Sequence, residues 1–134
     1  MKDTLETVET LFLNVATVNF GGYPVHKTSI DKIRIPYGSV VHVDVDGTIC
    51  DTNGANYASA VPIPENIAKI NYLYENNGCK IIYWTARGKT TGVDWLAVTL
   101  DQLDRWGCKR HGLSFVKPQF DYFIDDKAVR IEEI

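Results

Sequence analysis

The sequence predicts an α/β fold built on a mostly parallel sheet, and three observations lead to this class. From residue 39 onward, short β-type runs alternate with helical patterns, and turn residues separate them. The first run, SVVHVDV at 39–45, carries the β-branched residues typical of a strand buried on both faces. Two later stretches repeat apolar residues at the 3.6-residue spacing of an amphipathic helix. Crossover helices between parallel strands predict a helix layer on each face of the sheet, and therefore a three-layer sandwich.

Turn and capping residues set the expected bounds of these elements. Strands are expected at 39–45, 79–84, 113–116 and 122–124. The first helix opens at Pro62 and Pro64 and ends at Asn77-Gly78, because proline suits a first helical turn and Asn-Gly ends a helix. The second helix ends at Gly107, and its apolar stripe consists of Leu96, Leu100, Leu103 and Trp106.

The first 37 residues differ from the rest of the chain. They predict one helix and a half-exposed edge strand around Ile30, Ile33 and Ile35. The stripe of the helix consists of Leu5, Val8, Phe12 and Val15. We therefore expect an accessory arm at 1–37 and one Rossmann-like core domain at 38–134.

Composition excludes several classes of function. The 134 residues are enough for one compact domain, and their net charge of −3 disfavours broad binding to a nucleic-acid backbone. The longest apolar runs fall far short of the ~20 residues that a membrane span needs, so no membrane association is expected. The three cysteines form neither a CxxC pair nor a disulfide framework. With no secretory signal pattern at the amino terminus, a cytoplasmic location is expected.

Polar side chains stand at the end of every expected strand. In open α/β sheets, ligands bind beyond the carboxyl ends of the strands, so this coincidence predicts a site there. The residues are Asp44 and Asp46 after the first strand, Thr85 and Arg87 after the second, Lys117 after the third, and Asp125 and Asp126 after the fourth.

The chemistry of these side chains suits phosphoryl transfer. Asp44 and Asp46 are two residues apart and converge on one volume, where a divalent cation relieves their repulsion. Asp125 and Asp126 add oxygen ligands, for which Mg²⁺ is the natural guest. Gly47 allows a sharp turn whose N–H groups can face an anion. Thr85 offers a hydroxyl donor and Lys117 a compact positive charge.

The motifs HVDVDGT, TARG, Lys117 and YFIDD resemble, in that order, the four motifs of the haloacid dehalogenase superfamily. The resemblance covers 39–134 and implies an Mg²⁺-dependent phosphomonoesterase with an aspartyl-phosphate intermediate. It implies Asp44 as the nucleophile, Asp46 as the general acid/base, and Thr85 and Lys117 as further catalytic residues. The ion would be held by Asp44, the backbone carbonyl of Asp46, and an acid of the fourth motif, Asp125 or Asp126.

The same resemblance implies how a substrate is held. Gly47, Thr48, Ala86 and Arg87 are expected to contact it. The stretches between the motifs are too short for a cap domain, so the site is expected to be open, and a homo-oligomer is one way to cover it. The substrate is then a phosphorylated small molecule or a nucleic-acid end.

Alternatives remain open at this stage. Asp46-Gly47 by itself is typical of an ordinary turn, and Arg87 suits a surface position, a substrate phosphate or a paired acid equally well. The TARG motif and the KPxxDxxIDD ending are also similar to the phosphatase part of polynucleotide kinase-phosphatases, which indicates a polynucleotide 3′-phosphatase. A phosphoacceptor or binding module with slow turnover is the alternative outside the enzymes.

Overall fold

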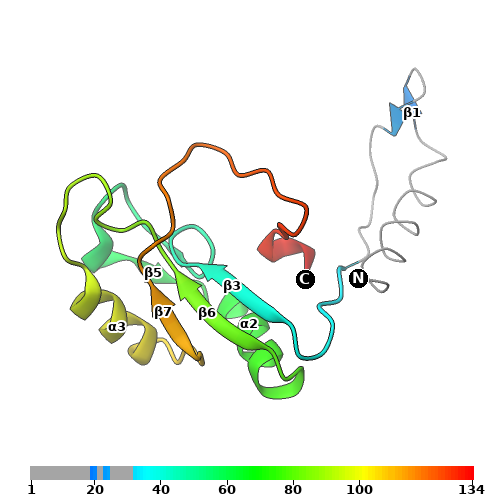
Figure 1. Ribbon diagram of the computed structural model, residues 1–134, viewed down its shortest axis with the longest axis horizontal. Coiled ribbons are helices and arrows are strands. Elements are labelled where there is room, and N and C mark those ends of the chain that lie inside the picture. Colours follow the sequence, from blue (N-terminus) through cyan, green and yellow to red (C-terminus); the bar gives the residue numbers. More distant parts are fainter. Residues whose placement is uncertain (1–18, 21–22, 25–31) are drawn as a thin grey trace. The chain divides into compact units, whose positions relative to one another are not determined.

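The computed structural model describes residues 19–20, 23–24 and 32–134, which belong to two compact units (Figure 1). The first unit comprises Met1–Pro36 with Lys127–Ile134, and the second comprises Tyr37–Asp126. All the predicted site residues lie in the second unit.

The described part of the first unit contains three short elements. Strands β1 (Asn19–Phe20) and β2 (Tyr23–Pro24) pair antiparallel, and Ile131–Glu133 form the 3₁₀ helix η2. The backbone N–H of Ile33 donates to the carbonyl of Glu133 at 2.6 Å. The expected helix with Leu5, Val8, Phe12 and Val15 lies outside the described residues, as does Ile30. Residues 32–35 are in no strand, so the expected edge strand is absent from its described part.

The second unit is built on a parallel sheet of three strands. These are β3 (Val40–Asp44), β6 (Lys80–Trp84) and β7 (Gly112–Ser114), in the spatial order β3-β6-β7. Helix α2 (Pro64–Asn76) connects β3 to β6, and helix α3 (Leu96–Arg105) connects β6 to β7. The predicted mostly parallel α/β class is therefore confirmed, because each crossover helix joins two neighbouring parallel strands.

Helix α2 follows its prediction closely. Pro64 occupies the first turn, and Gly78 takes a φ of 61° just past the carboxyl end. The predicted apolar stripe of this helix consists of Ile63, Ile67, Ile70 and Tyr74. Ile67 and Ile70 are buried, whereas Ile63 and Tyr74 are half-buried, and Leu73 is buried outside the predicted stripe. The expected periodicity therefore identified the centre of the packed face.

Helix α3 departs from its predicted apolar stripe. Leu103 is fully buried, but Leu96 and Leu100 are exposed. The other buried positions are polar, namely Thr99 and Gln102. A polar side chain is buried at low cost only where hydrogen bonds satisfy it, and the partners of these two lie in the site described below.

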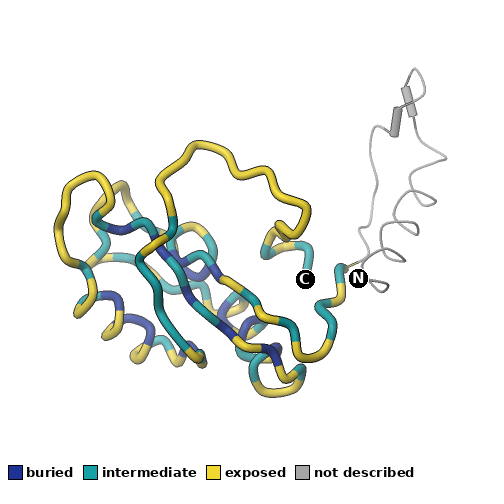
Figure 2. Tube along the Cα trace, in the orientation of Figure 1, coloured by how far each residue is buried: buried dark blue, intermediate teal, exposed yellow. Residues whose placement is uncertain are grey.

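Burial alternates along the sheet. Val43, Ile81 and Tyr83 are buried, whereas His42 is exposed and Trp84 is half-buried (Figure 2). Successive side chains of a strand point to opposite faces, so one face of the sheet holds the core and the other is partly open among the described residues of this unit. A helix layer on each face, the three-layer arrangement without a cap, stays a prediction.

The fourth expected strand, at 122–124, is wrong for this structure. Those residues have no regular secondary structure, and Tyr122 and Ile124 are 89% and 96% exposed. Three residues of high β-propensity do not make a strand without a partner that takes their backbone hydrogen bonds. The third strand is also shorter than expected, since β7 ends at Ser114.

A small hairpin separates β3 from α2, where the sequence indicated only a polar loop. It pairs β4 (Cys50–Asp51) antiparallel with β5 (Val61–Pro62), and η1 (Tyr57–Ser59), a 3₁₀ helix, lies between them. Pro62 therefore belongs to a strand, and the helix begins at Pro64. The backbone N–H of Ile63 donates to the carbonyl of Ile49 at 2.8 Å, which attaches the hairpin to the turn after β3.

Candidate active site

Asp44 ends β3 and pairs with a lysine that follows β7. The ammonium Nζ of Lys117 lies 3.1 Å from Oδ1 of Asp44, and the hydroxyl of Thr48 donates to Oδ2 at 3.1 Å. A third of the Asp44 side chain is exposed, against 16% of the Lys117 side chain. The carboxylate is thus oriented on two sides and still open to solvent.

Asp46 has a different partner, the buried guanidinium of Arg87. The Nε of Arg87 donates to Oδ2 at 2.9 Å, and its Nη2 donates to Oδ1 at 2.8 Å. The Arg87 side chain is 0% exposed, whereas a quarter of the Asp46 side chain reaches solvent. Thr52, in the loop after β4, also donates its hydroxyl to Oδ1 at 2.5 Å. Of the three roles left open for Arg87, the structure supports pairing with an acid.

These contacts decide the charge of Asp46. Burial by itself would raise the pKa of this carboxyl, but the hydrogen bonds from Arg87 and Thr52 and the positive charge of Arg87 outweigh it, so the pKa is lowered. Asp46 is therefore ionised at neutral pH in the free protein.

Gly47 makes the sharp turn that the sequence predicts, but its N–H does not face an open site. Its φ of 83° lies in the left-handed region. The N–H of Gly47 donates to the carbonyl of Cys50 at 2.8 Å, and the N–H of Thr48 donates to the carbonyl of Val45 at 3.2 Å. In this structure the turn itself takes both donors, and contact of Gly47 and Thr48 with a substrate stays a prediction.

Thr85 follows β6 and is buried. Its hydroxyl oxygen accepts the backbone N–H of Arg87 at 3.1 Å, which fixes the turn that carries Arg87 to Asp46. The next residue, Ala86, is half-buried, and its carbonyl accepts the N–H of Lys89 at 3.0 Å. In this structure both residues shape the loop after β6.

The structure does not bring the fourth motif to the other two acids. Asp125 and Asp126 are exposed in the segment without regular structure that replaces the expected strand. Within residues 19–20, 23–24 and 32–134, no three side chains of His, Cys, Asp or Glu are grouped closely enough to hold a metal ion. Among the residues that the structure describes, Asp44 and Asp46 are the predicted ligands that supply carboxylate oxygens at the end of β3.

Four residues of the site were missed by reasoning from the sequence. Thr99 and Gln102 accept hydrogen bonds from Nη1 of Arg87 at 3.0 and 2.6 Å, and the ring of Tyr57 stacks 4.8 Å from its guanidinium carbon. Thr52 is the fourth. The available signal was the pair of polar residues three apart on α3, which lie on one face of a helix.

All three cysteines lie in the interior of the protein, away from solvent. Cys50, Cys79 and Cys108 are free thiols and all are buried. Burial raises the pKa of Cys50 and of Cys108 to about 11, so both are neutral thiols at neutral pH.

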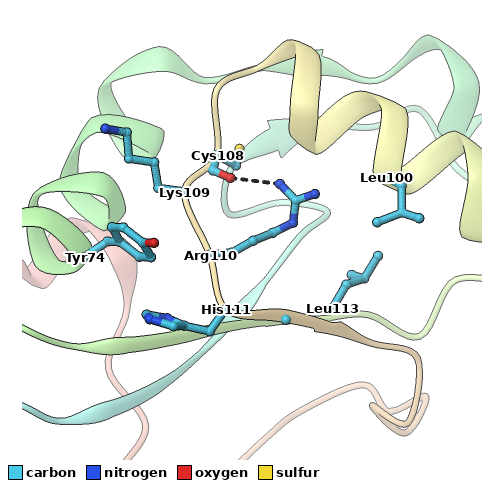
Figure 3. Close-up of a pocket in the computed structure, with 8 residues that line it drawn as sticks. Tyr74, Leu100, Cys108, Lys109, Arg110, His111 and Leu113 are labelled. Atoms are coloured by element: carbon cyan, nitrogen blue, oxygen red, sulfur yellow. Dashed lines mark hydrogen bonds between the residues drawn. The ribbon is translucent and has the colours of Figure 1, made fainter.

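A separate groove of about 590 Å³ lies at the opposite end of the sheet, around the amino end of β7 (Figure 3). Its cations are neutralised locally: Arg110 pairs with Asp104 at 2.7 Å, and Lys109 pairs with Glu75 at 2.5 Å. The Nη1 of Arg110 also donates to the carbonyl of Cys108 at 2.9 Å. None of the predicted site residues lines this groove.

Comparison with known proteins gives a likeness of fold. No family model matches the chain, and no curated protein matches it significantly. A crystal structure of a structural-genomics target from Vibrio cholerae is similar with a TM-score of 0.63 and 24% sequence identity, over 71% of this chain and 85% of that one. The match supports the α/β architecture. No helix among the described residues has the length and apolar character that crossing a membrane requires.

Proposed function

We propose that this protein is a phosphomonoester hydrolase that works through an aspartyl-phosphate on Asp44. The observation that carries the proposal is the contact between Asp44 and Lys117, which joins a solvent-open carboxylate at the end of one strand to a cation from beyond another. A partly exposed carboxylate held by a cation and a hydroxyl suits attack on phosphorus. Asp46 supplies a second carboxylate whose protonation is controlled separately, by Arg87.

In the first half of the proposed reaction, a carboxylate oxygen of Asp44 forms a bond to phosphorus while the bond from phosphorus to the leaving oxygen breaks. The positive charge of Lys117 and the hydroxyl of Thr48 orient the nucleophile, and Lys117 offsets charge on the phosphoryl oxygens. The leaving oxygen takes a proton from Asp46. Because Asp46 is ionised in the free protein, this role needs the negative charge of the bound phosphate to raise its pKa.

In the second half, water attacks the phosphorus of the aspartyl-phosphate. Asp46 accepts a proton from this water, and the bond from phosphorus to Asp44 breaks, which releases inorganic phosphate and restores the carboxylate. The lowered pKa of Asp46 suits this base role directly, since the group is already ionised.

Mg²⁺ is part of the proposal on the chemistry of the donors. Asp44 and the backbone carbonyl of Asp46 are hard oxygen donors at one strand end, and Asp125 or Asp126 would complete the set on moving from its exposed position. When bound, the ion would neutralise charge on the transferring phosphoryl group.

The substrate class proposed is a phosphorylated small molecule, with a nucleic-acid 3′ end as the second candidate. The net charge of −3 favours the small molecule, because backbone binding gains affinity from many basic side chains. A homo-oligomer that covers the open site, the absence of a cap and a cytoplasmic location belong to the same proposal.

Release of inorganic phosphate from a panel of phosphorylated metabolites, p-nitrophenyl phosphate and a 3′-phosphorylated oligonucleotide, with Mg²⁺ present, tests this function. We expect sustained turnover of p-nitrophenyl phosphate and preference for one small-molecule class. Stoichiometric labelling without turnover would instead indicate a phosphoacceptor module. No phosphate release or labelling with any substrate would contradict the proposal.

A further inference from the structure

Arg87 is a buried cation whose hydrogen bonds are made to groups within the protein. Four of its five N–H donors are taken: two by the carboxylate of Asp46, and two on Nη1 by Thr99 and Gln102. Its side chain is 0% exposed. Direct binding of a substrate phosphate is therefore the less favoured role, because the arrangement would have to be broken first.

The residues behind Arg87 are themselves fixed. The amide of Gln102 accepts from Arg87 through Oε1 at 2.6 Å and donates through Nε2 to the carbonyl of Tyr57 at 2.6 Å. Both ends of this amide are thus engaged, which determines its orientation. Gln102 therefore links α3 to η1 of the β4–β5 hairpin. It also links α3 to Asp46, because it binds Arg87 and Arg87 binds Asp46.

Such a network is a costly way to gain stability alone. Thr99 and Gln102 are 0% and 1% exposed, at positions of α3 where apolar residues would fill the core. Replacing a buried ion pair and its polar neighbours by well-packed apolar residues is often neutral or stabilising. What the bidentate geometry adds is orientation, because a planar guanidinium holds both carboxylate oxygens in one plane.

We infer that Arg87 is a positioning residue, which holds the carboxylate of Asp46 in the orientation needed for proton transfer, and that Thr99 and Gln102 hold Arg87 in turn. This inference rests on the proposed phosphatase function. It assigns Arg87 a role through Asp46 and not a contact with substrate.

The test compares two substrates that differ in their need for a proton. Phenyl phosphate has a poor leaving group, whereas p-nitrophenolate departs from p-nitrophenyl phosphate without protonation. The first variant is Arg87→Lys, which keeps the positive charge but loses the planar guanidinium that binds both carboxylate oxygens. The second is Gln102→Leu, which removes a hydrogen bond to Arg87 and changes no direct contact of Asp46. Asp101→Asn is the control, because Asp101 pairs with Arg105 on the exposed side of the same helix. Thermal unfolding verifies that each variant is folded.

The rate compared is that of leaving-group release in the first turnover, because Asp46 also acts as the base in the second half of the reaction with either substrate. We expect Arg87→Lys to lose at least about tenfold in this rate on phenyl phosphate and at most about threefold on p-nitrophenyl phosphate, since general acid catalysis contributes roughly 10²–10⁴-fold. Gln102→Leu should show the same selectivity with a smaller loss. On phenyl phosphate, the double variant Arg87→Lys with Asp46→Asn should be little slower than Asp46→Asn alone, because the two residues act as one unit.

Three outcomes would overturn the inference. Equal losses of the first-turnover rate on both substrates, a rise in KM with kcat unchanged, or additive losses in the double variant would each give Arg87 a different role while leaving the phosphatase function in place. A folded wild-type protein that hydrolyses neither substrate would contradict the proposed function, and the inference with it.

Discussion

Lys117 reaches Asp44 across the sheet: its Nζ lies 3.1 Å from Oδ1 although Lys117 follows β7, two strands away from β3. The contact is possible because all three strands are parallel and their carboxyl ends meet at one edge. It brings a carboxylate and a cation together from opposite ends of the second unit's sequence.

Replacing Lys117 by Ala should leave the fold intact and lower kcat by about 100-fold, since one charge that orients the proposed nucleophile Asp44 and would offset the phosphoryl oxygens is lost. Lys117→Arg should recover little, because a planar guanidinium does not replace a compact ammonium. Lys89→Ala, in the exposed loop after β6, is the matched control. Turnover of p-nitrophenyl phosphate and thermal unfolding measure both properties. A wild-type kcat in Lys117→Ala would show that Lys117 does not contribute to the reaction.

Metal removal should abolish turnover. We expect EDTA to stop phosphate release and added Mg²⁺ to restore it, whereas Ca²⁺ should restore it poorly because the larger ion takes more ligands in a looser geometry. Asp125→Asn and Asp126→Asn should raise the Mg²⁺ concentration needed for half-maximal turnover by unequal amounts. The variant with the larger rise identifies the residue that binds the ion. Full activity in excess chelator would contradict the metal part of the account.

The loop that carries Arg87 depends on glycine at position 88. Gly88 has a φ of 83°, and a Cβ there would collide with the backbone carbonyl oxygen of Val93. Gly88→Ala should lower the free energy of unfolding by about 2–3 kcal/mol, from the left-handed backbone and the collision together. Gly92→Ala is the control, because its φ of 74° is similar but its Cβ would meet nothing within 4 Å. That variant should lose only about 1 kcal/mol. Urea denaturation measures the free energy of unfolding of both variants. Equal losses in the two would show that the loop moves and avoids the collision at position 88.

The stability of the protein should fall at alkaline pH, with Cys108 as one cause. Burial raises the pKa of this thiol from 9.0 to about 11, so the folded state keeps a proton that the unfolded state releases. Its contribution is fully present below pH 9 and is lost as the pH rises toward 11, by at most about 2–3 kcal/mol. Cys108→Ala should therefore show a smaller drop in the free energy of unfolding between pH 8 and pH 10.5 than the wild type. An unchanged drop would exclude Cys108 as its source.

The sequence predicted the parts of this site that follow from topology. Placing polar residues at the ends of parallel strands was enough to anticipate that Asp44 and Lys117 meet, and the periodicity of α2 identified its buried face. For Arg87 the sequence left three roles open, of which pairing with an acid was one. Nothing in the sequence around an arginine at the end of a strand indicates which acid it pairs with.

Other features could not be read from local pattern. Thr99 and Gln102 are buried on α3 because Arg87 needs acceptors there, a tertiary requirement that overrides the leucine stripe. Residues 122–124 have the composition of a strand, but composition does not supply a neighbour for their backbone groups, and here they are exposed.

Trapping of the phosphoenzyme in two variants tests the central claim most directly. Asp44→Asn and Asp46→Asn remove one charge each from residues two apart at the end of β3, so each is the control for the other. After brief reaction with p-nitrophenyl phosphate and acid quench, Asp46→Asn should retain a hydroxylamine-sensitive phosphoryl group, because the leaving group needs no proton but water activation needs a base. Asp44→Asn should carry none. Labelling that persists in Asp44→Asn, or its absence from a folded Asp46→Asn that still consumes the substrate, would contradict Asp44 as the nucleophile.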